Sequence, residues 1–160
     1  MRPYQPEWAA RVATLAAELR ALLPDALAAE HIGSTSIPGM SAKAYIDMMI
    51  VVDDLEACRA LPVLTAAGGK LWPKLVFAPP IGAPHCNIHV RLAGAETTRL
   101  ARLFRDDLHI HPDKVQLWPA FKLKVTAAAP DLSAYGQIKA LVWLLLMELA
   151  EVWDRARREK

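Results

Sequence analysis

The sequence predicts an α/β (α+β) fold in a single domain. Four segments between residues 27 and 92 have the composition or alternation of β-strands, and the chain after Gly94 is helical in pattern to its end. A length of 160 residues and an apolar content of 54% suit one domain with its own core. Neither an internal repeat nor a linker divides the chain, so we expect one domain over residues 1–160.

The first elements are a helix and a short strand. Apolar residues recur every three or four positions over residues 6–22, which predicts an amphipathic helix that Pro24 ends. The apolar stripe consists of Trp8, Val12, Leu15, Leu19 and Leu22. A strand is expected next, over residues 27–32, with Gly33 directly after it.

A second strand is predicted over residues 44–52, and it contains the strongest functional signal in the sequence. Its residues are mostly Ile, Val, Met and Tyr, which favour strands. The alternation places Asp47 on one face with Tyr45, Met49 and Val51. A carboxylate on a buried strand is costly unless something cationic meets it, so Asp47 requires an explanation.

Further along the chain we expect a helix over residues 55–67, a strand over 71–77 and a loop over 78–84. Residues 86–92 alternate regularly and predict another strand. Its apolar face should pack against helices, and it consists of Ile88, Val90 and Leu92. Its polar face should meet a cleft or solvent, and it consists of Asn87, His89 and Arg91.

Three helices are predicted in the C-terminal part, over residues 97–109, 113–128 and 132–157. The last helix has an apolar stripe and further large apolar residues on its other sides. Such a helix is either deeply buried or used at an interface. One expected partner is therefore a second copy of the chain, in a homodimer formed through this helix.

Charge and composition argue against several classes of protein. A net charge of +2 gives no strong nucleic-acid signal. The most apolar run, residues 140–147, is too short to span a bilayer, and the first residues lack the apolar segment of a secretory signal. Cys58 and Cys86 form no spacing motif. We therefore expect a cytoplasmic protein with no membrane partner.

Gly33, Ser34, Thr35 and Ser36 form a candidate phosphate-binding loop. Glycine leaves backbone N–H groups free to converge on one point, and the hydroxyls add hydrogen-bond donors. A polar turn is the alternative interpretation, because the spacings of a P-loop and of a nucleophile elbow are both missing. Lys43 adds a positive charge that suits phosphate.

Asp47 and His89 are candidate metal ligands. A carboxylate on a core strand suits Mg²⁺, which prefers oxygen ligands and substrate phosphates. An ion pair between Asp47 and Lys43 or an arginine is an equally open interpretation. His89 fits a metal ligand, a general base or a core histidine. Zinc is disfavoured, because Cys86 has only two histidines near it.

Four segments of the sequence resemble the GrpB family, also called UPF0157. The most specific is the run HIGSTSIPGMSAK at residues 31–43, together with Tyr45 and Asp47. The other three are Asn87-Ile-His89-Val, Phe104-Arg-Asp-Asp-Leu with His111-Pro, and Tyr135 with Lys139.

This resemblance implies a nucleotidyltransferase-like fold, with a short mixed β-sheet flanked by helices and a helical C-terminal part. In that superfamily a Gly-Ser loop holds the nucleotide, and carboxylates on neighbouring strands hold two metal ions. Gly33 and Ser34 match the loop, and Asp47 matches the first carboxylate. Met49 stands at the second carboxylate position and cannot bind Mg²⁺, and His89 stands at the third.

The sequence therefore predicts a protein that binds a nucleotide or another phosphorylated small molecule. The residues expected to bind phosphate are Gly33, Ser34, Thr35, Ser36, Lys43 and Arg91. Asp47 and His89 are the expected catalytic residues, around one Mg²⁺ ion, for nucleotidyl or phosphoryl transfer. Because Met49 replaces a carboxylate, a binding or regulatory module without transfer chemistry is the alternative. A scaffold acting through the last helix is a third hypothesis.

Overall fold

The computed structural model describes residues 1–56, 65–66, 74–78 and 85–159. The elements in chain order are α1 (Glu7–Leu22), β1 (Ala28–Ile32), the 3₁₀ helix η1 (Ser34–Ser36), β2 (Ile46–Val52), β3 (Thr65–Ala66), β4 (Lys74–Ala78), β5 (Cys86–Leu92), α3 (Glu96–Ile110), α4 (Pro112–Ala128) and α5 (Leu132–Arg158). Strands thus precede a helical C-terminal part, as the sequence predicts.

The strands form one mixed sheet in the order β1-β2-β5-β4-β3. The central pair, β2 and β5, is parallel, and the other neighbouring pairs are antiparallel. The parallel register places Asp47 beside Asn87 and Met49 beside His89. Residues paired in this way project to the same face of the sheet, so the polar residues of the two strands meet.

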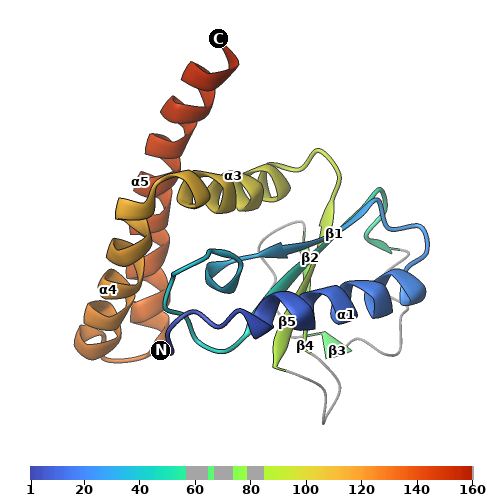
Figure 1. Ribbon diagram of the computed structural model, residues 1–160, viewed down its shortest axis with the longest axis horizontal. Coiled ribbons are helices and arrows are strands. Elements are labelled where there is room, and N and C mark those ends of the chain that lie inside the picture. The colour runs from blue at the N-terminus through green and yellow to red at the C-terminus, as the bar shows by residue number, and fades with distance from the viewer. Residues whose placement is uncertain (57–64, 67–73, 79–84, 160) are drawn as a thin grey trace.

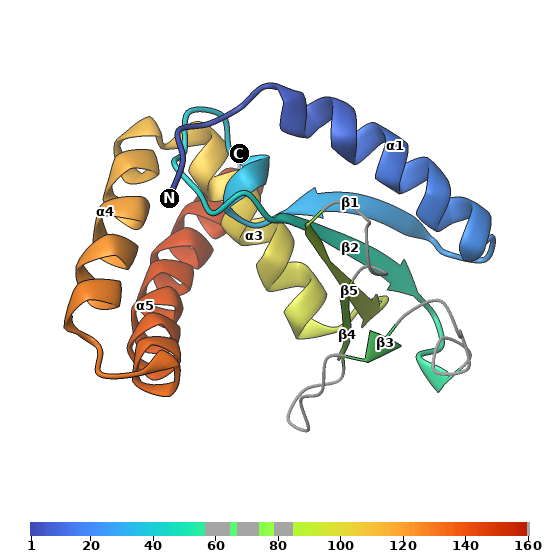
Figure 2. The ribbon, with the colours of Figure 1, turned by 90° about the horizontal axis from the view of Figure 1, so that it is seen from below.

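Helices cover both faces of the sheet, with α1 on one side and α3 on the other (Figure 2). The face toward α1 buries Met48 and Ile50 of β2 and Val90 of β5 against Leu19. The opposite face buries Met49 and Val51 of β2 together with Ala101 of α3, and it is the face of Asp47. The predicted alternation of β2 is therefore confirmed.

A second core holds the C-terminal helices together, with α4 and α5 lying side by side at one end of the sheet (Figure 1). Phe104 of α3 packs edge-on against Trp118 of α4, with ring centroids 5.5 Å apart. Ile37 and Met40, which follow η1, are fully buried in the same cluster. This packing places the Gly-Ser segment against α4 and α5.

The outer side of α5 is apolar and exposed. Five side chains in a row along it are between 41% and 66% exposed: Ile138, Leu141, Leu145, Leu149 and Val152. Among the described helices, α5 alone is long and apolar enough to cross a membrane, although core helices of soluble proteins meet the same criterion. A homodimer through this helix stays a prediction.

Element boundaries agree closely with the sequence pattern, with one clear exception. The helix predicted over residues 55–67 falls mostly on residues outside the described part, but Thr65 and Ala66 form β3. That end of the helix prediction is therefore wrong. The two residues pair with Ala78 and Phe77 of β4, and strand pairing overrides the local helical pattern. Residues 71–73 and 79–84, where a strand and a loop were predicted, also lie outside the described part.

We expect Asp107→Ala to lower the free energy of unfolding by about 3–5 kcal/mol, because it leaves a largely buried ammonium without its partner. Asp107 is fully buried near the end of α3, and its carboxylate accepts hydrogen bonds from Lys114 Nζ at 2.9 and 3.0 Å. Urea unfolding measures the loss.

The matched control is Asp106→Ala. The Asp106 side chain is 46% exposed and pairs with Arg105 at 2.8 Å, and such pairs contribute less than about 1 kcal/mol. Equal losses in the two variants would show that the buried pair has no special weight in the stability of the protein.

Candidate functional site

A pocket of about 240 Å³ lies where β2 and β5 begin and where η1, α4 and α5 meet them. Asp47 and Asn87 form its floor at the start of the two parallel strands. Ser34 and Thr35 line it from η1, and the helices contribute lysines. Residues distant in the sequence thus converge on the carboxylate that the sequence pattern singles out.

Asp47 is held in its ionised form. Asn87 Nδ2 donates to its Oδ1 at 2.8 Å, and His89 Nε2 lies 3.4 Å from the same oxygen. Burial raises the pKa of Asp47, but the hydrogen bonds from His89 and Asn87, together with charge interactions with His89 and Lys139, outweigh it and hold the pKa below its usual value. Asp47 is therefore a carboxylate at neutral pH.

Position 33 requires glycine for two reasons: its backbone conformation and the lack of space for a side chain. Its φ is +73°, which side chains other than glycine rarely adopt. A Cβ at this position would also lie 2.5 Å from Asp47 Oδ2, so the backbone packs directly on the carboxylate. Ser36 Oγ donates to the carbonyl of Gly33 at 2.6 Å, which fixes the turn that follows. Ser36 therefore supports the loop rather than facing the pocket.

Thr35 is buried, and its hydroxyl group is fully used. It donates to the carbonyl of Tyr45 at 3.3 Å and lies 2.9 Å from His31 Nε2, from which it accepts. Burial, together with the positive charges of Arg105 and His109, lowers the pKa of His31 to about 4 despite the nearby charge of Asp47. A neutral His31 thus fixes η1 through Thr35.

Three lysines line the pocket: Lys43, Lys122 and Lys139. Lys122 Nζ donates to Ser34 Oγ at 2.9 Å and lies 5.9 Å from the centroid of the Trp118 ring. Burial and the positive charges of Lys139 and Lys43 lower the pKa of Lys122 to about 8, although Asp47 opposes the shift. Positive charge is therefore in excess here, which suits an anionic ligand.

His89 and Arg91 lie on the same sheet face but outside the pocket lining. His89 contacts Asp47 through Nε2, and its Nδ1 is buried without a hydrogen-bond partner. Arg91 is 9% exposed, and its Nη1 donates to the carbonyl of Thr97, just inside α3. The guanidinium of Arg91 is thus directed toward α3 rather than toward the pocket.

The residues around Asp47 do not fit a Mg²⁺ site. Asp47 Oδ1 is engaged by Asn87 and His89, and Oδ2 packs against Gly33. Met49, at the second carboxylate position, is fully buried. Within the described part of the chain, no three His, Cys, Asp or Glu side chains cluster as metal ligands would. Mg²⁺ needs several oxygen ligands, and this donor set supplies one carboxylate.

A larger hollow of about 370 Å³ lies between the start of α3 and the C-terminal part of α5. Its arginines already have acidic partners: Arg99 pairs with Glu96 and Glu151, and Arg157 pairs with Asp154. Because these positive charges are neutralised within the protein, the smaller pocket at Asp47 is the stronger candidate for ligand binding.

Lys122 and Lys139 were not among the site residues predicted from the sequence. Lys122 lies on the inner side of α4 with Trp118 and Val125. A lysine within the apolar face of that helix is the sequence feature that could have identified it as a site residue. Lys139 belongs to a segment that resembles the GrpB family, but nothing in its spacing connects it to Asp47. Tertiary packing brings both lysines to the carboxylate.

The sequence model of the GrpB protein family matches residues 1–148. The chain belongs to the GrpB family. A UPF0157 protein of Deinococcus radiodurans is 31% identical over 153 residues, which cover 90% of this chain and 78% of the relative. A crystal structure of a conserved GrpB protein from Enterococcus faecalis matches with a TM-score of 0.80 at 24% identity, over 94% of this chain and 98% of that one, and shows the same fold.

Two other similar proteins are much longer than this GrpB chain. The UPF0157 protein YqkA of Bacillus subtilis is 30% identical over 142 residues, which cover 84% of this chain and 41% of the relative. A dephospho-CoA kinase of Mycolicibacterium paratuberculosis is 28% identical over an alignment of 171 positions, gaps included, which covers 86% of this chain and 42% of the kinase. The chain thus spans less than half the length of both relatives.

We expect Gly33→Ala to be more damaging than Gly39→Ala. Both glycines have a positive φ, +73° and +77°, but a Cβ at Gly39 would meet nothing within 4 Å. Gly39→Ala should therefore cost only the backbone strain of about 1–2 kcal/mol. Gly33→Ala adds a collision with Asp47 and should be less stable than the control in urea unfolding. Equal stability of the two variants would show that Asp47 moves aside freely.

Proposed function

We propose that this GrpB protein binds a nucleotide or another phosphorylated small molecule in the pocket at Asp47. The observation that supports this proposal is the convergence of Lys43, Lys122 and Lys139 around a single carboxylate. Lysine ammonium groups bind phosphate as point charges, and a hydroxyl such as that of Ser34 adds a donor.

The charge distribution favours an anion over a neutral ligand. Within the described part of the chain, none of the three lysines forms an ion pair, although Asp47 lines the same pocket. Lys122 instead donates to a neutral hydroxyl, Ser34 Oγ. A phosphate group would give these ammonium groups negatively charged acceptor oxygens.

Two versions of this function differ in whether chemistry follows binding. A transferase would move a nucleotidyl or phosphoryl group mainly by positioning and charge stabilisation, with Asp47 beside the ligand and His89 in contact with Asp47. A binding or regulatory module would hold the ligand without turnover, and the buried Met49 favours this version. The relative named dephospho-CoA kinase suits a phosphorylated ligand, but most of that enzyme lies outside the match.

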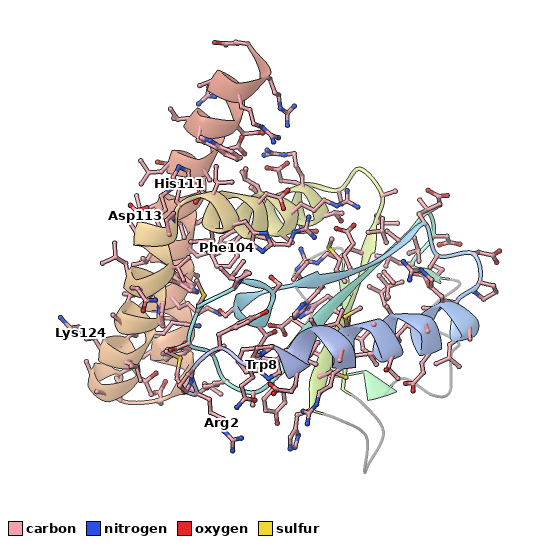
Figure 3. All side chains as sticks on the ribbon, in the orientation of Figure 1. Arg2, Trp8, Phe104, His111, Asp113 and Lys124 are labelled. Carbon is pink, nitrogen blue, oxygen red and sulfur yellow. The ribbon has the colours of Figure 1, made fainter. Side chains whose placement is uncertain are left out.

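Titration of ATP, CTP, GTP and UTP by isothermal calorimetry tests the proposal, with adenosine as the phosphate-free control. Lys122→Met should weaken nucleotide binding about 10- to 100-fold, because hydrogen bonds to charged groups are each worth about 1.5–3 kcal/mol. Lys124→Met is the matched control: Lys124 lies on α4, is exposed and points outward (Figure 3).

Equal losses in the two variants, or no binding of any phosphorylated compound, would refute the proposed site. A pyrophosphate-release assay on the bound nucleotides then separates the two versions. Turnover would identify a transferase, and binding without turnover would identify a module.

Ligand affinity should fall as the pH rises through about 8. The pKa of Lys122 is lowered to about 8, so its ammonium is present below that pH and lost above it. Phosphate esters complete their second ionisation near pH 6, so the ligand charge is constant in this range. Calorimetry between pH 6.5 and 9.5 measures the effect. Lys122→Met should abolish it, and a persistent dependence would point to another group.

A further inference from the structure

We propose that the lysines of this pocket take the place of a divalent cation, so that the ligand binds by its phosphate end as a metal-free anion. The inference rests on the proposed function and specifies how its ligand is recognised. It runs against the Mg²⁺ dependence that the family resemblance implies.

The first step concerns the carboxylate. Asp47 Oδ1 accepts a hydrogen bond from Asn87 Nδ2 at 2.8 Å and faces His89 Nε2 at 3.4 Å. Asp47 Oδ2 lies so close to Gly33 that a Cβ there would be 2.5 Å away. Oδ1 is thus taken by hydrogen bonds within the protein, Oδ2 lies against the backbone at Gly33, and Met49 offers no second carboxylate. The carboxylate is placed to hold protein groups rather than a hydrated cation.

The second step concerns what faces the carboxylate. Lys43 precedes β2, Lys122 lies on α4 and Lys139 lies on α5, so three separate segments each contribute a lysine to the pocket lining. In two-metal sites the bound cations neutralise the charge of the phosphates. Here three lysine side chains are available for that purpose, and they would also repel a divalent cation.

The third step concerns size. The pocket of about 240 Å³ is smaller than the range of about 300–1,000 Å³ in which drug-sized ligands are enclosed. It therefore accommodates a phosphate or pyrophosphate group, with the rest of a larger ligand outside. We infer that affinity comes mainly from the phosphate end, and that inorganic pyrophosphate is a sufficient probe.

Calorimetric titration of pyrophosphate in EDTA and in excess Mg²⁺ provides the test. We expect binding in EDTA to be at least as tight as in Mg²⁺, because Mg²⁺ competes with the lysines for the phosphate oxygens. Lys139→Met should weaken binding in EDTA about tenfold, the effect of losing one charge-assisted contact, whereas Lys124→Met should leave it unchanged.

Asp47→Asn separates the two modes of binding, with circular dichroism confirming that the variant is folded. An anion held by lysines should bind Asp47→Asn as well as or better than the native protein, since one repulsive charge is gone. An anion held through a cation should lose affinity at least tenfold.

Binding that requires Mg²⁺ and is lost in Asp47→Asn would overturn this inference and leave the proposed function standing. If pyrophosphate and the nucleotides bind in neither buffer, both proposals fail. Retained binding in EDTA with Lys139→Met unaffected would also overturn the inference, because the anion would then lie elsewhere.

Discussion

Asp47 carries its charge on a strand whose remaining residues are buried, and the neighbouring strand provides the groups that stabilise it. The parallel register of β2 and β5 places Asn87 beside Asp47 and brings His89 within reach of the same oxygen. The backbone at Gly33 then packs on the other oxygen. The position of this carboxylate in the pocket therefore depends on the pairing of two strands and on the turn at Gly33.

The lysines reach this carboxylate through packing of the second core. Ile37 and Met40, on the segment after η1, are fully buried with Trp118 of α4. The same contact brings Lys122, one turn after Trp118, to Ser34. Loss of packing in this core would therefore move a positive charge away from the site, so that stability and ligand affinity are linked through α4.

Local patterns predicted much of this arrangement, because Asp47, Gly33 and the faces of β2 and β5 follow from alternation and turn chemistry within short windows. The pairing of Thr65 with β4 and the approach of Lys122 to Ser34 depend on contacts between segments that are separated in the sequence. Strand pairing and core packing decide such contacts, and a periodic pattern shows which face is apolar but not which segment packs against it.

The position of Asp47 also constrains how the chain can fold. Side chains alternate between the two faces of β2, so a shift of one residue in its pairing would turn Asp47 toward the apolar layer beneath α1. There it would lie among residues such as Met48 and Ile50, without the donors that now stabilise it. The charge in the binding pocket thereby penalises misaligned strands, and it contributes to the fidelity of folding.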